Sequence, residues 1–341
     1  MKKKYDIAVF IGRFQPLHNA HLEIIKKASE ISDKVILIIG SAFQPRTYKN
    51  PFTEHDRLVM LKVICDEHKI KNVIIDYTTD SIYNDQAWAI RIQRIVDGYS
   101  NNKINKIAIF GHDKDDSTFY LSMFPQWQRE HIDLIEPLHS TDIRDLYFRN
   151  DVNMNFIKGV VPSYTFKFLE DFKNRSEYLQ IIKEREFIES YKKQYECLPY
   201  PPVFVTTDTV VIQSGHVLMV KRRAEPGKGL WALPGGFLDV NNDKSMVSCA
   251  IRELKEETGI KVPVPVLIGS IKENKVFDAI NRSARGRTIT HAFYIQLPDG
   301  ELPKVKGQDD AEKASWIHIA HLDSSEVFED HYEIIQTFVG A

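Results

Sequence analysis

Two histidines near the start of the chain, His18 and His21, stand three residues apart at the end of a short loop. The loop follows an apolar run at residues 7–11, typical of a buried parallel strand, and leads into apolar residues at helical spacing. Gly12 lets the backbone approach a ligand, Arg13 adds positive charge, and the helix start attracts an anion. The segment predicts a phosphate site in which two imidazoles donate hydrogen bonds. A zinc pair is the alternative, disfavoured because no cysteine or third histidine is nearby in the sequence.

A second set of potential catalytic residues lies far along the chain, at Arg252, Glu253, Glu256 and Glu257. On a helix that ends at Gly259, the three glutamates stand three and four residues apart and share one face. Carboxylates crowded on one face repel each other unless a cation lies among them, and their hard oxygens suit Mg²⁺ or Mn²⁺. The spacing predicts a metal site, with a solvated surface cluster as the alternative.

Polar groups also follow other strands expected in the first half of the chain. Arg46, Lys49 and Asn50 lie in a basic loop and could contact phosphate or stay solvated. Gly111 and Asp113 follow a later apolar run, where they could hold ribose hydroxyls or water around Mg²⁺, or form an exposed turn. These loops are the expected nucleotide contacts.

Two expected helix starts add further candidates. Trp88, four residues after Asn84, could stack on a flat cationic ring or belong to the core. Ser140 or Thr141 is expected to cap a helix whose first turn carries Arg144. Hydroxyl, backbone N–H groups and guanidinium would then converge on one anion.

The elements that position these residues can be read from apolar periodicity. Through about residue 150, strands alternate with amphipathic helices, which predicts an α/β fold, an open parallel sheet with helices on both faces. The polar loops would gather at one edge of that sheet. The expected strands are residues 7–11, 35–40, 73–77, 107–110 and a fifth near 132–135, with helices at 53–69, capped by Thr53, and at 85–99.

The second half of the chain has a different pattern. A charged helical stretch runs from Ser163 to about Glu196, and prolines at residues 198–202 stop it. Strands are expected at 203–205, 209–212, 217–220 and 289–296, with a hairpin through Ser214 and Gly215 and a glycine turn at 229–237. We therefore predict two domains, residues 1–175 and an α+β domain at 203–341, joined by a helical, proline-rich linker at 176–202.

Composition limits the class of protein. A length of 341 residues is sufficient for two cores, and the formal net charge of −2 is made of mixed charges, which disfavours a nucleic-acid or membrane partner. Cys65, Cys197 and Cys249 are far apart and match neither a disulfide framework nor a zinc ribbon. We therefore expect a cytoplasmic protein without a membrane span.

The first motif resembles the HxGH signature of nucleotidyltransferases, with Ala20 in place of the usual glycine, and residues 12–18 resemble the nicotinamide mononucleotide (NMN) adenylyltransferase branch. Residues 140–144 resemble the second signature of the same family. The resemblance implies a Rossmann-like domain in which His18, His21 and Arg144 stabilise the transition state at the α-phosphate of ATP. Its implied substrate-binding residues are Gly12, Arg13, Phe14, Arg46, Lys49, Asn50, Asn84, Trp88, Gly111, Asp113, Ser140 and Thr141.

The glutamate motif resembles the back half of the Nudix box, in which an arginine, here Arg252, orients a metal-binding glutamate. The front half departs from the pattern, because seven rather than five residues separate Gly236 from Lys244, which stands where a glutamate is expected. The resemblance implies catalysis by Arg252, Glu253 and Glu257 and metal binding by Glu253, Glu256 and Glu257. Three arginines in a later basic loop are expected to hold a diphosphate or to form a dimer contact: Arg282, Arg285 and Arg287.

The order of the two motif sets resembles bacterial bifunctional enzymes that join NMN adenylyltransferase to ADP-ribose pyrophosphatase. This implies ATP, NMN, NAD and ADP-ribose as ligands and Mg²⁺ or Mn²⁺ as cofactor. Three alternatives stay open: nicotinic acid mononucleotide as substrate of the first domain, a Nudix domain that only binds a nucleotide or cleaves another nucleoside diphosphate derivative, and a tRNA-directed protein. The absence of a basic stripe in the sequence disfavours the last, and a homo-oligomer is left open.

Overall fold

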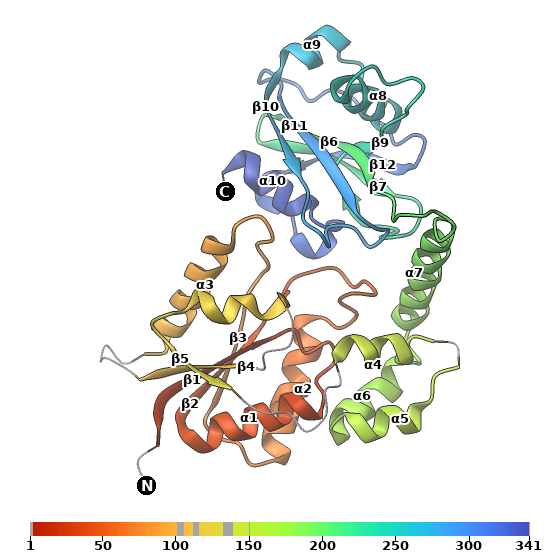
Figure 1. Ribbon diagram of the computed structural model, residues 1–341. Helices are drawn as coiled ribbons and strands as arrows, with labels where there is room; N and C mark the ends of the chain where they lie inside the picture. The colour runs from red at the N-terminus through yellow and green to blue at the C-terminus, as the bar shows by residue number, and fades with distance from the viewer. Residues whose placement is uncertain (1–2, 101–105, 112–115, 132–138, 150, 341) are drawn as a thin grey trace. The chain divides into compact units, whose positions relative to one another are not determined.

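The computed structural model forms two compact units, Met1–Ile182 and Lys183–Ala341 (Figure 1). The structure describes residues 3–100, 106–111, 116–131, 139–149 and 151–340. The division between the units lies inside the predicted linker, whose limits stay a prediction. Each unit has its own sheet and is considered separately below.

The first unit is built on a five-stranded parallel sheet in the order β3-β2-β1-β4-β5. This confirms the predicted open parallel sheet. The fifth strand ends where the predicted segment 132–135, outside the described residues, begins. The strands are β1 (Tyr5–Gly12), β2 (Ser32–Ile39), β3 (Val73–Tyr77), β4 (Ile107–Gly111) and β5 (Gln128–His131), and the helices are α1 (Asn19–Ile31), α2 (Glu54–Glu67), α3 (Asp85–Gly98), η1 (Asp116–Met123, a 3₁₀ helix), α4 (Ser140–Tyr147), α5 (Met154–Val160) and α6 (Ser163–Phe172).

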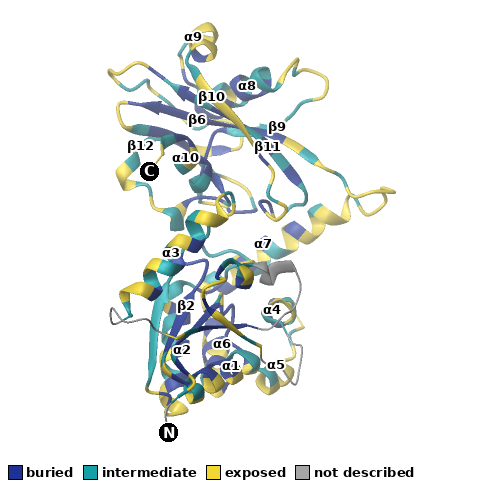
Figure 2. Cartoon of the chain, turned by 60° about the vertical axis from the view of Figure 1, so that its left-hand side comes forward, coloured by how far each residue is buried: buried dark blue, intermediate teal, exposed yellow. Residues whose placement is uncertain are grey.

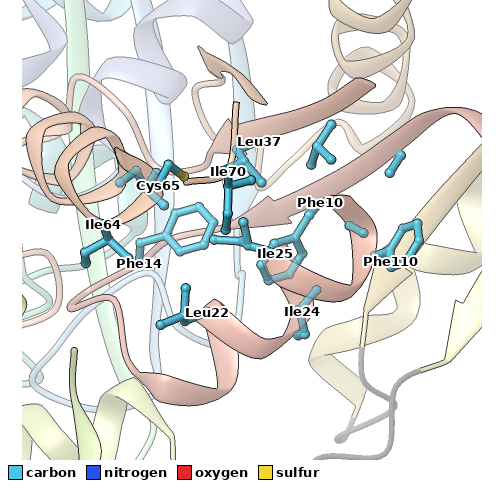
Figure 3. Close-up of a cluster of buried hydrophobic side chains, with 14 of the residues drawn as sticks. Phe10, Phe14, Leu22, Ile24, Ile25, Leu37, Ile64, Cys65, Ile70 and Phe110 are labelled. Carbon is cyan, nitrogen blue, oxygen red and sulfur yellow. The ribbon is translucent and has the colours of Figure 1, made fainter. Parts of the chain in front are cut away.

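Both faces of this sheet are covered, which explains why its strands read as continuous apolar runs. Figure 2 shows β2 buried along most of its length. Side chains alternate along a strand, so Phe10 of β1 packs with Ile24 and Ile25 of α1 on one face (Figure 3). Val9 packs with Ile92 of α3 on the other face. The predicted start of α2 is also confirmed, since Thr53 caps it by accepting a hydrogen bond from the Asp56 N–H.

A third cluster fixes α4 against α6 and the start of α7 (Ser176–Lys193), which crosses from one unit to the other. The Tyr147 hydroxyl donates to the Leu169 carbonyl at 2.7 Å, and the Tyr178 hydroxyl donates to the Tyr147 carbonyl at 2.9 Å. These bonds satisfy buried polar groups inside an aromatic cluster. They give α4 a fixed position relative to the other helices of the unit.

The second unit contains a seven-stranded mixed sheet in which only β11 and β6 pair in parallel. The main order is β10-β11-β6-β7-β12, with β8 added to β7 and β9 added to β6. The strands are β6 (Phe204–Gln213), β7 (His216–Arg222), β8 (Trp231–Ala232), β9 (Gly235–Phe237), β10 (Ile271–Phe277), β11 (Thr288–Gln296) and β12 (Ala311–His318), and the helices are α8 (Met246–Thr258), α9 (Val264–Gly269), α10 (His331–Val339) and the short 3₁₀ helices η2 (Ile319–His321) and η3 (Ser324–Glu326).

Helices α8 and α10 pack on opposite faces of this sheet. Leu254 of α8 packs with Ile295 of β11, whereas Phe338 of α10 lies against the ring of the adjacent Tyr294. The predicted hairpin through Ser214 and Gly215 joins β6 to β7 and is confirmed. Among the described residues, no helix combines the length and apolar character that a membrane crossing needs.

The two short strands predicted at 203–205 and 209–212 are one ten-residue strand, β6, which corrects the sequence interpretation. The residues between the two predicted strands are polar. They continue the strand because partners satisfy their side chains inside the unit. Asp208 accepts from the Thr290 hydroxyl at 2.6 Å, and the Thr207 hydroxyl contacts the Cys249 sulfur at 3.2 Å.

Candidate active sites

The two predicted histidines lie together at the start of α1. The centroids of the His18 and His21 rings are 3.8 Å apart, and the His18 backbone N–H donates to His21 Nδ1 at 3.4 Å. Because Nδ1 of His21 accepts this bond, the neutral ring carries its proton on Nε2. Nε2 is thereby a donor, as a phosphoryl contact requires.

Packing determines the path of the loop that leads to these histidines. Phe14 is buried in the core of the unit although its backbone has a positive φ of 52° (Figure 3). A Cβ added to Gly12 would lie 2.9 Å from the Phe14 ring, so the glycine leaves room for that ring. Gln15 then exchanges two hydrogen bonds with the backbone of Phe52, at 2.8 and 3.0 Å. The structure thus gives Gly12 and Phe14 packing roles in the predicted phosphate loop.

Arg144 brings the second predicted motif to this loop. Its guanidinium donates to the Gln15 carbonyl at 2.7 Å and to the Thr141 hydroxyl at 3.1 Å. Its Nε is buried and has no hydrogen-bond partner among the described residues. Burial and the charge of Arg13 lower the pKa of Arg144 to about 10. Two like charges held next to each other with an unused donor favour an anionic ligand at this point.

The start of α4 differs from the prediction. Its N-cap is His139, whose N–H donates to the Asp142 carboxylate at 3.0 Å, and neither Ser140 nor Thr141 caps it. The Ser140 hydroxyl instead donates to the Pro16 carbonyl at 3.1 Å. Because α4 begins at Ser140, Arg144 lies in the second turn rather than the first. The later position lets the side chain reach the β1–α1 loop.

The basic loop after β2 is held mainly by its own contacts. Arg46 forms an ion pair with Asp56 at 2.8 Å and donates to the Pro51 carbonyl at 2.7 Å. This pairing favours a structural role for Arg46 over the predicted phosphate contact. Lys49 is exposed, and the Asn50 side-chain oxygen is buried without a hydrogen-bond partner among the described residues.

The remaining predicted contacts of the first unit lie near α3 and β4. Asn84 caps α3, since its side-chain oxygen accepts from the Ala87 N–H at 3.0 Å. Trp88 is partly buried, with its ring centroid 5.7 Å from that of Tyr120. Gly111 ends β4, where a Cβ would lie 2.7 Å from Leu121. Asp113 lies outside the described residues.

Arg57 organises the nucleotide loops but was not predicted to do so. Its buried guanidinium donates to the carbonyls of Arg13, Gly40 and Ser41 at 2.6 to 2.9 Å. It thereby ties together the loops that follow β1 and β2. The available sequence signal was a charged residue one turn into a helix that covers the sheet, beside the loop it binds.

In the second unit, α8 carries the predicted glutamates and ends at Gly259, which has a positive φ of 59°. The predicted helix and its end are thus confirmed. One Glu257 oxygen accepts from the Gly235 N–H at 3.0 Å. A Cβ on Gly236 would lie 2.5 Å from the Glu253 carboxyl carbon, and one on Gly235 would lie 2.1 Å from the Thr207 carbonyl oxygen. Gly235 and Gly236 of the predicted glycine turn begin β9 and lie against two of the glutamates because they have no side chains.

Electrostatics around these glutamates fits a cation. Burial, with the nearby charge of Glu253, raises the pKa of Glu257 to about 8, and burial also raises the pKa of Glu253. Hard carboxylate oxygens in this situation suit a divalent ion. In the part of the chain that the structure describes, no three His, Cys, Asp or Glu side chains form a ready metal-binding group. The side chain of Glu256 is 46% exposed and bound to Arg252, so its predicted metal role stays a prediction.

Arg252 contacts three carboxylates. It donates to Glu253 at 2.8 Å, to Glu256 at 2.9 Å and, through two nitrogens, to both oxygens of Asp243 at 3.0 and 2.7 Å. Asp243 was not among the predicted residues. Hydrogen bonds from Arg252 lower the pKa of Asp243 to about 2. The sequence signal was a carboxylate directly before Lys244, which occupies the expected glutamate position.

The three predicted arginines have different surroundings. Arg282 is buried and forms a two-bond ion pair with Asp330 at 2.8 and 2.9 Å, which favours a structural role. Arg287 donates to the Asp278 carbonyl at 2.6 Å. Arg285 lies over the Phe237 ring at 5.1 Å, and its Nε is buried with no hydrogen-bond partner among the described residues. Of the three arginines, only Arg285 has a described contact with the glycine turn, through the Phe237 ring.

Arg222, at the end of β7, is a further cation that the sequence interpretation missed. Its guanidinium lies 4.0 Å from the centroid of the Phe328 ring, and its Nε donates to the Pro226 carbonyl at 2.9 Å. Burial, and then the charge of Arg285, lower the pKa of Arg222. The Lys221-Arg222-Arg223 run was visible in the sequence, but only strand alternation distinguishes the inward residue from its neighbours.

Comparison with known proteins finds relatives of both units. A cytidylyltransferase-like family model matches residues 9–146, and a NUDIX domain model matches residues 203–338. The chain is 35% identical over 183 residues to the nicotinamide/nicotinic acid mononucleotide adenylyltransferase of Acinetobacter baylyi, covering 52% of this chain and 92% of that one. It is 32% identical over 160 residues to the ADP-ribose pyrophosphatase of Methanocaldococcus jannaschii, covering 47% and 83%.

Solved structures of the same bifunctional enzyme match almost the whole chain. The one with bound ligands is the crystal structure of a bifunctional NMN adenylyltransferase/ADP-ribose pyrophosphatase from Francisella tularensis, complexed with AMP and a manganese ion. It has a TM-score of 0.91 and 35% sequence identity, and the match covers 98% of this chain and 99% of the other. With both halves matched in the same order, this chain belongs to the family of bifunctional NMN adenylyltransferase/ADP-ribose pyrophosphatases.

Proposed function

We propose that the first unit transfers AMP from ATP to NMN, giving NAD and pyrophosphate, and that the second unit hydrolyses ADP-ribose to AMP and ribose 5-phosphate. The observation that carries the proposal is that each unit holds its own charged site of the appropriate sign. The first site has paired imidazoles and two arginines. The second has buried glutamates beside a glycine turn.

In the first reaction, a 5′-phosphate oxygen of NMN bonds to the α-phosphorus of ATP while the bond to the pyrophosphate oxygen breaks. Negative charge moves onto the leaving pyrophosphate and the equatorial oxygens. His18, His21, Arg13 and Arg144 would stabilise that charge from positions set before the substrates arrive. Arg144 is held for this by Gln15 and Thr141.

In the second reaction, water adds to one phosphorus of the diphosphate and the bridging oxygen leaves with the other, giving two monophosphates. Arg285, Arg222 and the glycine turn would hold the diphosphate, because the charge of Arg285 acts on Arg222 and the two guanidinium groups repel one another without an anion. Glu253 and Glu257 would hold the cation. Mg²⁺ or Mn²⁺ would, when bound, polarise the phosphoryl oxygens.

The binding preferences of the relatives refine this proposal. Manganese accompanies AMP in the Francisella structure, and the Acinetobacter relative is named for both nicotinamide and nicotinic acid mononucleotide. We propose NMN as the substrate of this chain, with nicotinic acid mononucleotide as its competitor. Parallel assays with each mononucleotide, compared by kcat/KM, test that preference.

The decisive experiment is chromatographic product analysis of the full chain with Mg²⁺ or Mn²⁺, in reactions with ATP plus NMN and with ADP-ribose alone. We expect His18→Ala to abolish NAD formation only, and Glu257→Gln to abolish AMP release only. Absence of NAD from the unmodified chain would refute the first activity. If ADP-ribose survives with either metal, the second unit is a nucleotide-binding module or cleaves another nucleoside diphosphate derivative, which Lys244 at the usual glutamate position would then explain.

A further inference from the structure

The loop between the glycine turn and α8 carries a carboxylate that none of the motif positions accounts for. Lys244 stands where the box pattern has glutamate, and it is exposed. Asp243, directly before it, points at Arg252. We propose that Asp243 is a positioning residue for the hydrolytic site, holding Arg252 so that Arg252 orients Glu253 toward a bound divalent cation. This inference rests on the hydrolytic activity proposed above.

The geometry of the guanidinium carries the inference. One edge of Arg252 donates to both oxygens of Asp243 at 3.0 and 2.7 Å. Its remaining nitrogen, Nη1, donates to Glu253 Oε1 at 2.8 Å and to Glu256 Oε2 at 2.9 Å. Because the guanidinium is planar and rigid, fixing one edge fixes the direction of the other donors. The position of Asp243 thereby determines the orientation of Glu253, the glutamate that would bind the metal.

The hydrogen bonds within this loop place Asp243, and not Lys244, beside Arg252. The Asp239 N–H donates to Asp243 Oδ2 at 2.8 Å, and the Asp243 N–H donates back to the Asp239 carbonyl at 3.0 Å. The Asp239 carboxylate accepts from the Asn241 N–H at 2.9 Å and the Asn242 side chain at 2.6 Å. These bonds close a compact turn that takes up the two additional residues. The side chain of Asp243 is 2% exposed and faces Arg252.

The charges around Arg252 support the same positioning role for Asp243. Without Asp243, the guanidinium would have Glu253 and Glu256 as its described carboxylate partners and would compete with a cation for their oxygens. With Asp243, two of its nitrogens are engaged away from Glu253, and one bond to Oε1 remains to orient that carboxylate. Such supporting contacts commonly change metal affinity or activity by about 10- to 100-fold when removed.

The test compares Asp243→Asn with a matched control, Asp299→Asn, in the full chain. Both variants convert one aspartate of the second unit to its amide, but Asp299 is exposed between β11 and β12, and only the first variant removes charge from Arg252. We expect Asp243→Asn to lower kcat/KM for ADP-ribose by about 10- to 100-fold and to raise the Mn²⁺ concentration for half-maximal rate, while NAD formation is unchanged. Asp299→Asn should leave all three values near those of the unmodified chain.

The inference is overturned if Asp243→Asn keeps both kcat/KM and Mn²⁺ dependence, or if Asp299→Asn loses as much. A general folding defect is excluded by equal NAD formation, and a loss of rate without a change in Mn²⁺ dependence also counts against a positioning role. If the unmodified chain does not cleave ADP-ribose, the proposed activity fails separately. Mn²⁺ binding, measured by electron paramagnetic resonance without ATP, then decides: weaker binding in Asp243→Asn supports the positioning role, and equal binding refutes it.

Discussion

At the level of single residues, the first site has a surplus of positive charge and the second site has a surplus of negative charge. Burial and the charge of Arg13 lower the pKa of Arg144, whereas burial and the charge of Glu253 raise the pKa of Glu257. Each surplus matches its proposed ligand, a phosphate in the first unit and a divalent cation in the second. Arg144 and Glu257 have no ion-pair partner among the described residues, which is typical of binding sites rather than of structural ion pairs such as Arg282 with Asp330.

His331 of the second unit allows a prediction of how stability depends on pH. Its Nδ1 accepts from the Leu233 N–H at 2.8 Å, and burial lowers its pKa to about 3 although Asp330 opposes that shift. On unfolding, His331 returns to its ordinary pKa of about 6.5. As the pH falls, the unfolded chain therefore binds a proton at a higher pH than the folded chain does. Stability supplied by the neutral ring is therefore present above about pH 6.5 and is lost progressively below it.

The measurement is chemical denaturation between pH 7 and pH 4, comparing the chain with His331→Asn, which keeps an acceptor for Leu233. We expect the free energy of unfolding of the unmodified second unit to decline more steeply on acidification, by up to about 1.4 kcal/mol per pH unit relative to the variant. Parallel curves for the two proteins would show that His331 does not titrate in this way.

At the level of elements, Gly235 and Gly236, the first two residues of β9, show two effects that a sequence cannot distinguish. A side chain on Gly235 would meet the backbone of Thr207 at 2.1 Å, whereas one on Gly236 would meet the end of the Glu253 side chain at 2.5 Å. Backbone of a paired strand cannot move aside, but a carboxylate can rotate. Strand β9 therefore depends on Gly235 for its pairing, and the metal site depends on Gly236.

We accordingly expect Gly235→Ala to destabilise the second unit by about 1–3 kcal/mol, the usual cost of overpacking. Gly236→Ala should lower ADP-ribose hydrolysis by at least about 10-fold, with little loss of stability. Thermal unfolding and kcat/KM, measured on the same samples, separate the two outcomes. Gly269→Ala, where an added Cβ meets nothing within 4 Å, is the matched control and should change neither. Equal effects of Gly235→Ala and Gly236→Ala on both quantities would contradict this assignment.

At the level of the whole molecule, two compact units with separate cores carry the two reactions. Each unit buries its own apolar clusters, as in the one around Phe10 and the one around Leu254. The units are therefore expected to unfold in separate steps. Ligands that bind one folded unit should stabilise that unit alone.

Differential scanning calorimetry checks this expectation. We expect two transitions, of which ATP with NMN raises one and Mn²⁺ with AMP raises the other, and Gly235→Ala should lower only the second. A single transition that shifts with either ligand pair would instead show that the units are coupled in stability.

Local pattern was sufficient for much of this molecule. Strands β1 and β2 of the first sheet were predictable because each is buried on both faces and reads as an apolar run, whereas β5 at the edge is polar and mostly exposed. Helix α8 was predictable because its apolar spacing and its Gly259 end are local signals. The pairs His18 with His21 and Glu253 with Glu257 follow from helical spacing alone.

Other features depended on partners distant in the chain. Arg46 and Arg285 are both basic residues in polar loops, yet one pairs with Asp56 while the other keeps a buried nitrogen unused. The cap of α4 shifted to His139 because Ser140 bonds to Pro16 across the unit. Strand β6 is continuous because the Asp208 carboxylate accepts a hydrogen bond from the Thr290 hydroxyl on β11.

The sequence by itself determined the fold class, the two motif sets and the residue types able to do the chemistry, since periodicity and spacing act within a few turns of chain. Only the tertiary structure decided which charges are satisfied by the protein and which remain for a ligand. Asp243 illustrates the reason. A carboxylate one position from the expected glutamate acquires its role only because a closed turn brings it to Arg252.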